Sequence, residues 1–388
     1  MLDDDKLRYK PVPLNELLTQ LKNLSQILMS LAYCSIFFND ETLYREMEEL
    51  DEKIDYLKSL LIMQASLATR DGEDAEKMLS VFDMASSVDK ISEVSLDIAK
   101  LAYEHLSIDI GDYLFINSAT NFIYVIEVSK RSPFNGRNID EIFEMVNQIF
   151  DVVAVKREKR FVISPPEHFV FREGDKLYIK GFTETIRKIL ELHGIKIDVG
   201  GLKLNREILE NIIYLKNLSE FMTDIAYGAL FTSSKELAEE LESMEETVDE
   251  ITNQLKITVM KDKGLKETQK LALIEFINSC EYIADAAVDM TYSLRKDVKP
   301  HPIIEKILEQ TDERYAIIKI GKEHENIDII DLDVKKYGVD VLALKRGGYW
   351  YLNPPIKGWK LRKDDELIIQ YYKEAEDEVE KLLRQSMA

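Results

Sequence analysis

Cysteine and histidine are scarce in this sequence, and an excess of positive charge is absent. The 388 residues contain two cysteines and five histidines. Cys34 and Cys280 both lie in apolar helical segments, so we expect buried free thiols in a reducing cytosol rather than a disulfide framework. The chain has 51 basic and 72 acidic residues, a net charge of −21. Such a chain repels phosphate backbones, so no nucleic acid partner is expected.

Motifs of common catalytic and cofactor sites are also missing. The sequence has no Gly-x-Gly-x-x-Gly, so NAD binding through a Rossmann domain is not expected. No histidine follows a glutamate at the three-residue spacing of di-iron bundles, and no nucleophile elbow is present. We therefore expect no enzyme. A metal-dependent hydrolase is the weakest alternative.

Long hydrophobic runs are lacking as well. The uncharged stretch from Leu24 to Phe38 is shorter than the roughly 20 residues that a membrane span requires. A second copy of this stretch carries Glu220 and Asp224, and charges at these positions do not suit hydrocarbon. We predict a core helix and no direct membrane span. The acidic start, Asp3 to Asp5, does not suit a signal peptide, so we expect a cytoplasmic protein.

A long internal repeat is the main feature that is present. Residues 21–55 and 215–249 align without a gap at an offset of 194, and 13 of the 35 positions are identical. Self-similarity at this separation indicates a duplicated unit. Helical periodicity predicts three long helices in each copy, with Asn15 capping the first, and short loops indicate an antiparallel bundle. The predicted helices span about 15–38, 40–69 and 73–105, then 203–230, 234–262 and 265–295.

Each bundle is followed by segments with the alternation of β-strands. The fold class predicted is therefore multidomain, α and α+β: a tandem duplication of a three-helix bundle and a small α+β domain. Strands are expected at 122–128, 152–156, 160–163 and 176–180, and again at 316–320, 341–345, 349–352 and 366–370. Helices are expected at 139–149, 183–192, 329–337 and 375–383. The predicted domains are 1–107, 108–198, 199–298 and 299–388.

Acidic residues four positions apart recur on the second and third helix of each bundle. Residues at i and i+4 share one helix face, so two such helices bring four carboxylates together. Oxygen-only ligands suit Mg, Ca, Mn or Fe, as divalent or trivalent ions. A solvated acidic surface is the alternative. The candidate metal ligands are Asp51, Asp55, Asp89 and Glu93 in the first copy, and Glu245, Asp249, Glu281 and Asp285 in the second.

Two known families are similar to these units. The acid-x-x-x-acid patterns Asp51–Asp55 and Glu245–Asp249 resemble those of the PhoU family. The α+β units resemble the TrkA-C (RCK-C) domain of potassium-transport gating proteins, on the segments 153–157 with Pro165-Pro166 and 342–346 with Pro354-Pro355. The whole chain looks like an archaeal PhoU–TrkA-C–PhoU–TrkA-C fusion, and its abundant Lys, Glu and Ile resemble thermophile usage.

The resemblance implies a regulatory protein that senses an ion or small ligand and modulates a cation transporter or channel, with potassium as the expected ion. It further implies TrkA-C units that pair with each other, either between the two chains of a homodimer or within one chain. A nucleotide effector such as cyclic di-AMP and metal clusters on the bundles are also implied. A phosphate-signalling adaptor of the PhoU type is the alternative. Lys156-Arg157 and Lys345-Arg346 end a strand in each unit, where they either meet an anionic ligand or face solvent.

Overall fold

The computed structural model describes residues 8–106, 108, 121–146, 150–158, 160–195, 205–304, 313–328, 339–352, 359–372 and 379. The helix predicted at 329–337 and the segment Pro354-Pro355 lie outside these residues, and of the helix predicted at 375–383 only Val379, in helical conformation, lies within them. Among the described helices, none is long and apolar enough to cross a membrane.

The first three long helices form the first bundle: α1 (Leu14–Phe37), α2 (Leu43–Ala68) and α3 (Gly72–Tyr103). The stretch with the membrane-like composition lies in α1, where Leu28, Leu31 and Ile36 are fully buried, so the prediction of a core helix is confirmed. Asn15 is not the cap. The helix begins at Leu14, and the N-cap residue is Pro13, whose carbonyl accepts from the Leu17 N–H at 3.1 Å.

The second bundle repeats this order. Its helices are α7 (Arg206–Thr232), α8 (Lys235–Lys261) and α9 (Glu267–Met290), followed by the short α10 (Tyr292–Arg295). Asn205 and Ser234 cap α7 and α8 through their side-chain oxygens, which accept from backbone N–H groups of the first turn. These caps fix the starts of the helices close to the predicted positions.

Each bundle is followed by a four-stranded antiparallel sheet. The first contains β1 (Asn121–Glu127), β2 (Phe150–Arg157), β3 (Arg160–Ile163) and β4 (Lys176–Phe182), in the order β1-β4-β2-β3. The second contains β5 (Glu313–Lys319), β6 (Val339–Arg346), β7 (Tyr349–Leu352) and β8 (Glu366–Tyr372), in the order β5-β8-β6-β7. The strand order is the same in both sheets. Helices α5 (Ile139–Val146) and α6 (Thr183–Leu192) belong to the first α+β unit.

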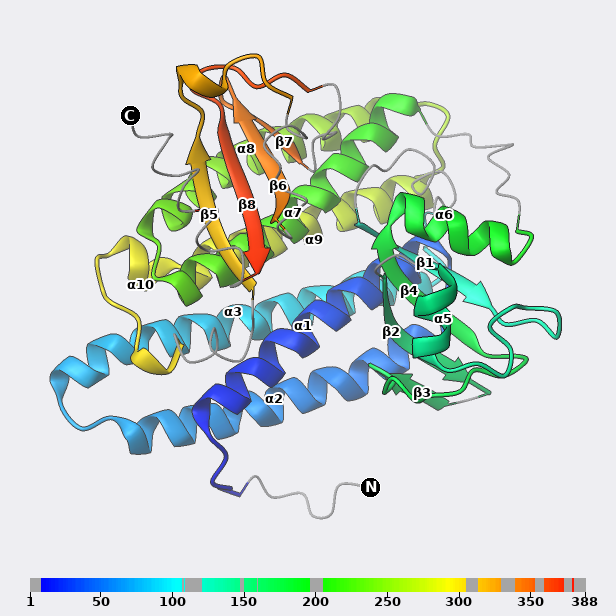
Figure 1. Ribbon diagram of the computed structural model, residues 1–388, viewed down its shortest axis with the longest axis horizontal. Helices are drawn as coiled ribbons and strands as arrows, with labels where there is room; N and C mark the ends of the chain where they lie inside the picture. The colour runs from blue at the N-terminus through cyan, green and yellow to red at the C-terminus, as the bar shows by residue number, and fades with distance from the viewer. Residues whose placement is uncertain are drawn as a thin grey trace.

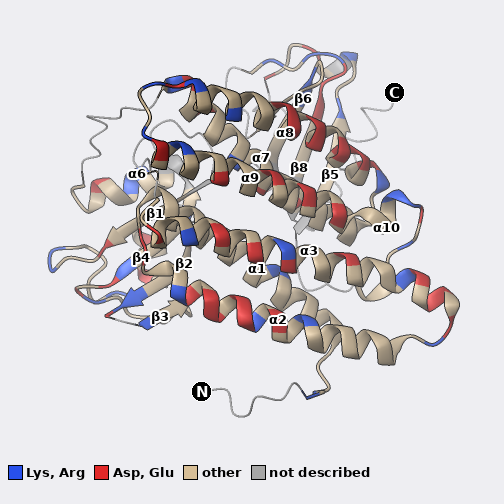
Figure 2. Ribbon diagram, turned by 180° about the vertical axis from the view of Figure 1, so that it is seen from behind, with Lys and Arg blue, Asp and Glu red and all other residues tan. Residues whose placement is uncertain are grey.

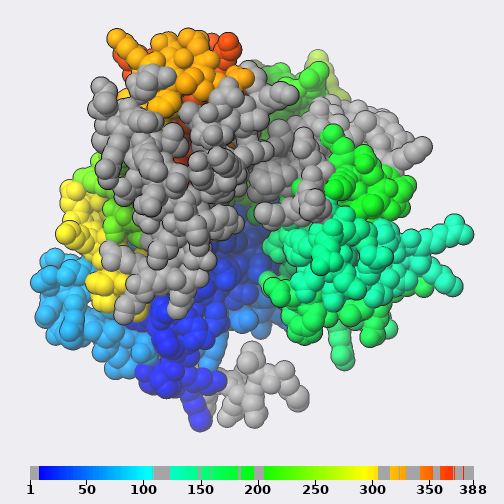
Figure 3. All heavy atoms as spheres, viewed as in Figure 1, coloured from blue at the N-terminus to red at the C-terminus, as the bar shows by residue number. Residues whose placement is uncertain are grey.

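The bundles pack together through α3 and α9, so that α2, α3, α9 and α8 lie side by side on one face of the molecule (Figure 2). Helices α1 and α7 lie behind this layer. The sheets cover the opposite side, where β1 contacts α1 and both β5 and β7 contact α7 (Figure 1). The two sheets occupy separate parts of that side, the first in green and cyan, the second in orange (Figure 3).

Helices α1 and α7 meet through contacts that occur in both directions. The Lys22 ammonium lies 5.9 Å from the centroid of the Tyr227 ring, and the Lys216 ammonium lies 5.0 Å from that of Tyr33. Each tyrosine hydroxyl also reaches a serine: Tyr227 and Ser25 are 2.8 Å apart, Tyr33 and Ser219 3.4 Å. The repeat offset of 194 maps Lys22, Ser25 and Tyr33 onto Lys216, Ser219 and Tyr227. The arrangement is that of a local two-fold axis.

The symmetry at this junction is incomplete. The buried Lys216 ammonium lies 2.5 Å from the Glu220 carboxylate, whereas Lys22 has Gln26 at the equivalent place. The Gln26 side-chain amide instead crosses to the other half and donates to Asp224 Oδ1 at 2.9 Å. Glu220 and Asp224, the two charged residues that do not suit a membrane span, therefore lie at the junction between the halves.

Candidate functional site

The four acids of the first bundle lie together on α2 and α3. We call Asp51, Asp55, Asp89 and Glu93 the first acidic group. The Asp89 carboxylate is held by the ammonium of Lys58 on α2, and the Ser92 hydroxyl donates to Asp51 Oδ1 at 2.5 Å. These contacts tie the two helices together at the surface.

The acids of the second bundle occupy the corresponding surface of α8 and α9. We call Glu245, Asp249, Glu281 and Asp285 the second acidic group. The Lys256 ammonium lies 2.8 Å from Glu281 Oε2. From the first bundle, Lys90 pairs with Asp289, one turn beyond Asp285, at 3.3 Å. Figure 2 shows that acidic residues follow α2, α3, α9 and α8 on this face of the molecule.

Close packing of like charges raises the proton affinity of these acids. Burial, and then the charges of Asp89 and Asp51, raise the pKa of the Asp55 carboxyl. Burial and the same two charges raise the pKa of Glu93. In the second group, burial and then neighbouring acids raise the pKa of Glu245, while at Asp285 burial is partly offset by Lys90. Carboxylates of this kind oppose folding at neutral pH unless a cation binds them.

Each group contains one carboxylate that is paired with a lysine ammonium. Lys58 and Lys256 each neutralise one member. Within the described residues, no three acidic, histidine or cysteine side chains converge on one point where a metal could bind. The donor chemistry, oxygen only, suits a hard cation. A cation that binds Asp89 or Glu281 would compete with the lysine that is paired with it.

We expect Asp55→Asn to raise the free energy of unfolding at pH 7 by about 0.5 kcal/mol, because it removes a charge that repels Asp51 and Asp89. The native state raises this pKa, so the native carboxyl binds its proton more tightly than the unfolded one. Its contribution to stability is therefore full at low pH and is lost as the pH rises through the native pKa. The gain from the variant should accordingly vanish below about pH 4.

Urea unfolding of chelator-treated protein at pH 4 and pH 7 measures this effect. Glu52→Gln is the matched control, since Glu52 is exposed on the same helix and outside the acidic group. An Asp55→Asn protein less stable than wild type at pH 7 would mean that the carboxylate makes a favourable contact that the like charges do not outweigh.

The two strand-end arginines, Arg157 and Arg346, each form hydrogen bonds to a buried aspartate. The Arg157 guanidinium donates two hydrogen bonds to Asp175, both at 2.7 Å, and the Asp175 side chain is 1% exposed. Arg346 does the same to Asp365, at 2.9 and 2.6 Å. These two arginines are therefore engaged with carboxylates of their own sheets. The lysines beside them instead point to the bundles: Lys156 donates to Thr42 at 2.5 Å, and Lys345 to Glu240 at 2.6 Å.

Asn39-Asp40 was predicted to cap the second helix, but the contact of Asp40 with the first sheet was not predicted from the sequence. The Asp40 carboxylate is 5% exposed and accepts hydrogen bonds from Lys176 (2.6 Å) and Tyr178 (2.7 Å) in β4, and from Thr42 (2.6 Å). Burial alone would raise the pKa of Asp40, but these hydrogen bonds outweigh it and lower the pKa. The second copy has Ser234 at this place, and that difference between the repeats was the available signal.

Residues 212–293, which extend from α7 into α10, match the family model described as PhoU domain. These are 82 of the 388 residues. No curated protein matches the chain.

Among solved structures, the crystal structure of PhoU from Pseudomonas aeruginosa is 13% identical with a TM-score of 0.40, covering 77% of this chain and 96% of that one. The RCK domain of GsuK is 11% identical with a TM-score of 0.18, covering 78% of this chain and 79% of that one. The GsuK channel bound to NAD is 10% identical, also at 0.18, covering 78% and 66%. Likenesses at these scores carry no weight for fold or function.

Proposed function

We propose that this chain is a regulatory protein of the PhoU type that modulates a cation transporter, with potassium as the expected ion. The observation that supports this most is the repeated combination of a three-helix bundle and a four-stranded sheet of one strand order. The PhoU domain match falls on the second bundle. We assign the sheets to TrkA-C units, and the chain to an archaeal PhoU–TrkA-C–PhoU–TrkA-C duplication.

In this proposal the sheets bind the ligand, and the bundles transmit the resulting change to the transporter. A ligand that binds one orientation of a sheet on its bundle more tightly shifts the population toward that orientation. Asp40 and Lys345 join sheet to bundle in the first and second halves, so a change at either contact is transmitted to α2 or α8. We further propose a homodimer formed through the TrkA-C units and a nucleotide effector such as cyclic di-AMP. Light scattering at micromolar concentration tests the dimer.

Deleting the gene should change rubidium uptake, a tracer for potassium transport, and leave phosphate uptake unchanged. Restoring the wild-type gene should return rubidium uptake to its original rate. Altered phosphate uptake with normal rubidium uptake would favour the second candidate, a phosphate-signalling adaptor. That candidate is supported by the PhoU domain match.

We also propose that the two acidic groups bind Mg, Ca, Mn or Fe in competition with Lys58 and Lys256. Manganese should then raise the melting temperature of chelator-treated protein. Manganese should raise the melting temperature of Lys256→Gln by more than that of the wild type, because the variant removes the competing ammonium from Glu281. The double variant Asp249→Ala, Asp285→Ala should lose the part of this rise in melting temperature that comes from the second acidic group. An identical manganese response in wild type and both variants would exclude metal binding at the second group.

A further inference from the structure

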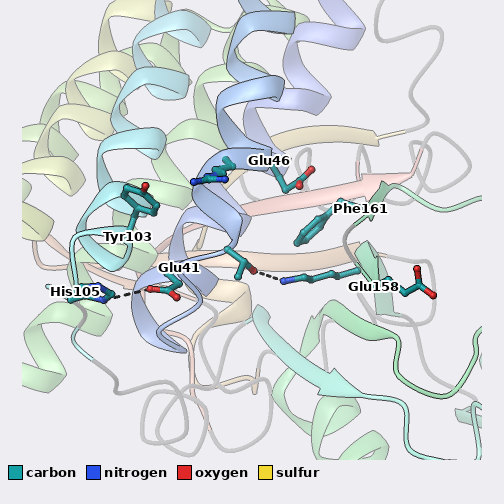
Figure 4. Close-up of a pocket in the computed structure, with 9 residues that line it drawn as sticks. Glu41, Glu46, Tyr103, His105, Glu158 and Phe161 are labelled. Atoms are coloured by element: carbon teal, nitrogen blue, oxygen red, sulfur yellow. Dashed lines mark hydrogen bonds and ion pairs between the residues drawn. The ribbon is translucent and has the colours of Figure 1, made fainter. Parts of the chain in front are cut away.

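A cavity of about 560 Å³ lies where the first sheet meets the first bundle. One wall is formed by the start of α2 and the end of α3, including Glu46 and Tyr103, and the other by the β2–β3 hairpin, including Phe161 (Figure 4). Protein cavities that bind small molecules have volumes of roughly 300 to 1,000 Å³. The volume is thus sufficient for a metabolite, and any molecule bound there touches both sheet and bundle.

The cavity contains an arginine that forms no ion pair within the described part of the chain. Arg45 is exposed, and its guanidinium carries a planar set of donors that suits a carboxylate or phosphate. Lys156 supplies a second positive charge: its ammonium donates to the Thr42 hydroxyl and lies 5.4 Å from the centroid of the Phe161 ring. The hydroxyl is a neutral partner, so the lysine charge is not cancelled by it.

Acidic groups line the same space. Glu46 lies beside Phe161, and Glu158 stands at the turn between β2 and β3 (Figure 4). A third acid, Glu41, lies 3.4 Å from the His105 ring nitrogen and is engaged there. A polyanion would be repelled by three carboxylates, and a pure cation by Arg45 and Lys156. The charges suit a molecule that carries both signs close together.

The second half of the chain does not repeat this arrangement. At the position of Arg45 it has Glu239, by the repeat offset of 194. The lysine that corresponds to Lys156 is Lys345, which is paired with Glu240 at 2.6 Å. The second half therefore joins sheet to bundle without an arginine at this position, so that junction does not require Arg45.

We propose that this cavity binds a small zwitterion of the α-amino acid type. Arg45 and Lys156 take its carboxylate, while Glu46 and Glu158 take its ammonium group. Its side chain packs against Phe161 and Tyr103, a tyrosine that is 42% exposed in this structure. Such a zwitterion is a second ligand beside the proposed nucleotide effector, and its regulatory consequence rests on the proposed function. The bound ligand holds the β2–β3 hairpin against α2, next to Thr42, whose hydroxyl also binds Asp40.

Isothermal titration of the purified full chain with each of the twenty common amino acids tests this proposal, with ATP and cyclic di-AMP as polyanion arms. At least one amino acid should bind saturably, and Arg45→Gln should weaken its binding at least about tenfold, since the anchor for the carboxylate is lost. Arg187→Gln removes the same charge from an exposed site on α6 and should leave the affinity unchanged. Circular dichroism of both variants checks that they are folded.

The proposal is overturned if no amino acid binds wild type at 10 mM ligand, about the weakest affinity of interest for a sensor. Equal affinity of Arg45→Gln and wild type would also overturn it, as would binding of ATP or cyclic di-AMP in this cavity without any amino acid. Because the titration involves no transporter, absence of binding leaves the uptake result untouched. Conversely, binding together with unchanged rubidium uptake would reject the transporter but keep the site.

Discussion

Phe276→Ala is expected to lower the free energy of unfolding by about 4 kcal/mol, the usual loss when a buried phenyl ring is removed from a core. Phe276 on α9 is fully buried, and its ring meets two rings of α1 in the other half. The ring centroids lie 5.2 Å from Phe37 and 6.0 Å from Tyr33, both with edge-to-face geometry. Such contacts add stability beyond the area that they bury.

Urea unfolding followed by circular dichroism measures this loss. Leu271→Ala on the same helix is the control, because that side chain is 48% exposed and its truncation should change stability little. Phe276→Leu should fall between the two, since it keeps most of the apolar volume. A loss below about 1 kcal/mol for Phe276→Ala would show that α1 does not pack on α9 as described.

Arg157→Met is expected to destabilise the first sheet by about 3 kcal/mol, because it leaves the buried Asp175 carboxylate without its ionic partner. The remaining partner is the backbone N–H of Arg172, at 2.8 Å. The arginine side chain is itself 30% exposed, so water can reach part of the site, and the lower end of the range for broken buried ion pairs applies. Arg157→Lys should recover little, since a lysine cannot make both hydrogen bonds.

Amide hydrogen exchange in β2 and β4 shows whether Arg157→Met loses stability in this sheet alone or in the whole protein. Arg346→Met should produce the same loss in β6 and β8, because Arg346 binds Asp365 in the same way. The exposed Arg160→Met, in the neighbouring strand β3, is the control. Unchanged exchange in β2 and β4 of Arg157→Met would mean that the paired guanidinium adds nothing to the sheet.

Helices and strands could be predicted largely from the sequence, because their periodicity is local. The strand 160–163, the hairpin strand 349–352 and the helix 183–192 have their predicted bounds. Spacing of four residues also placed the acids of each group on a common helix face. It could not show that Lys58 and Lys256 lie opposite them, since that depends on how neighbouring helices align. The central place of β4 and β8 in their sheets is likewise a matter of long-range pairing.

The cavity and the contact of Asp40 with the first sheet were missed for the same reason. Arg45, Tyr103 and Phe161 are separated by more than fifty residues of sequence, and none belongs to a motif. Their proximity follows from the docking of a sheet on a bundle. Comparing the repeats position by position, rather than for identity alone, shows Arg45 against Glu239 and Asp40 against Ser234. These differences point to both residues, which the search for shared positions passed over.

The crossing of α1 and α7 has the form of an interface between two identical subunits, yet both sides belong to one chain. Covalent linkage makes such an association independent of protein concentration. It also removes a constraint of symmetric dimers, in which every substitution is made twice. Here Glu220 can bind Lys216 while Gln26 stands at the matching place. A linked pair of this kind can assign ligand recognition to one half and leave the other as its scaffold.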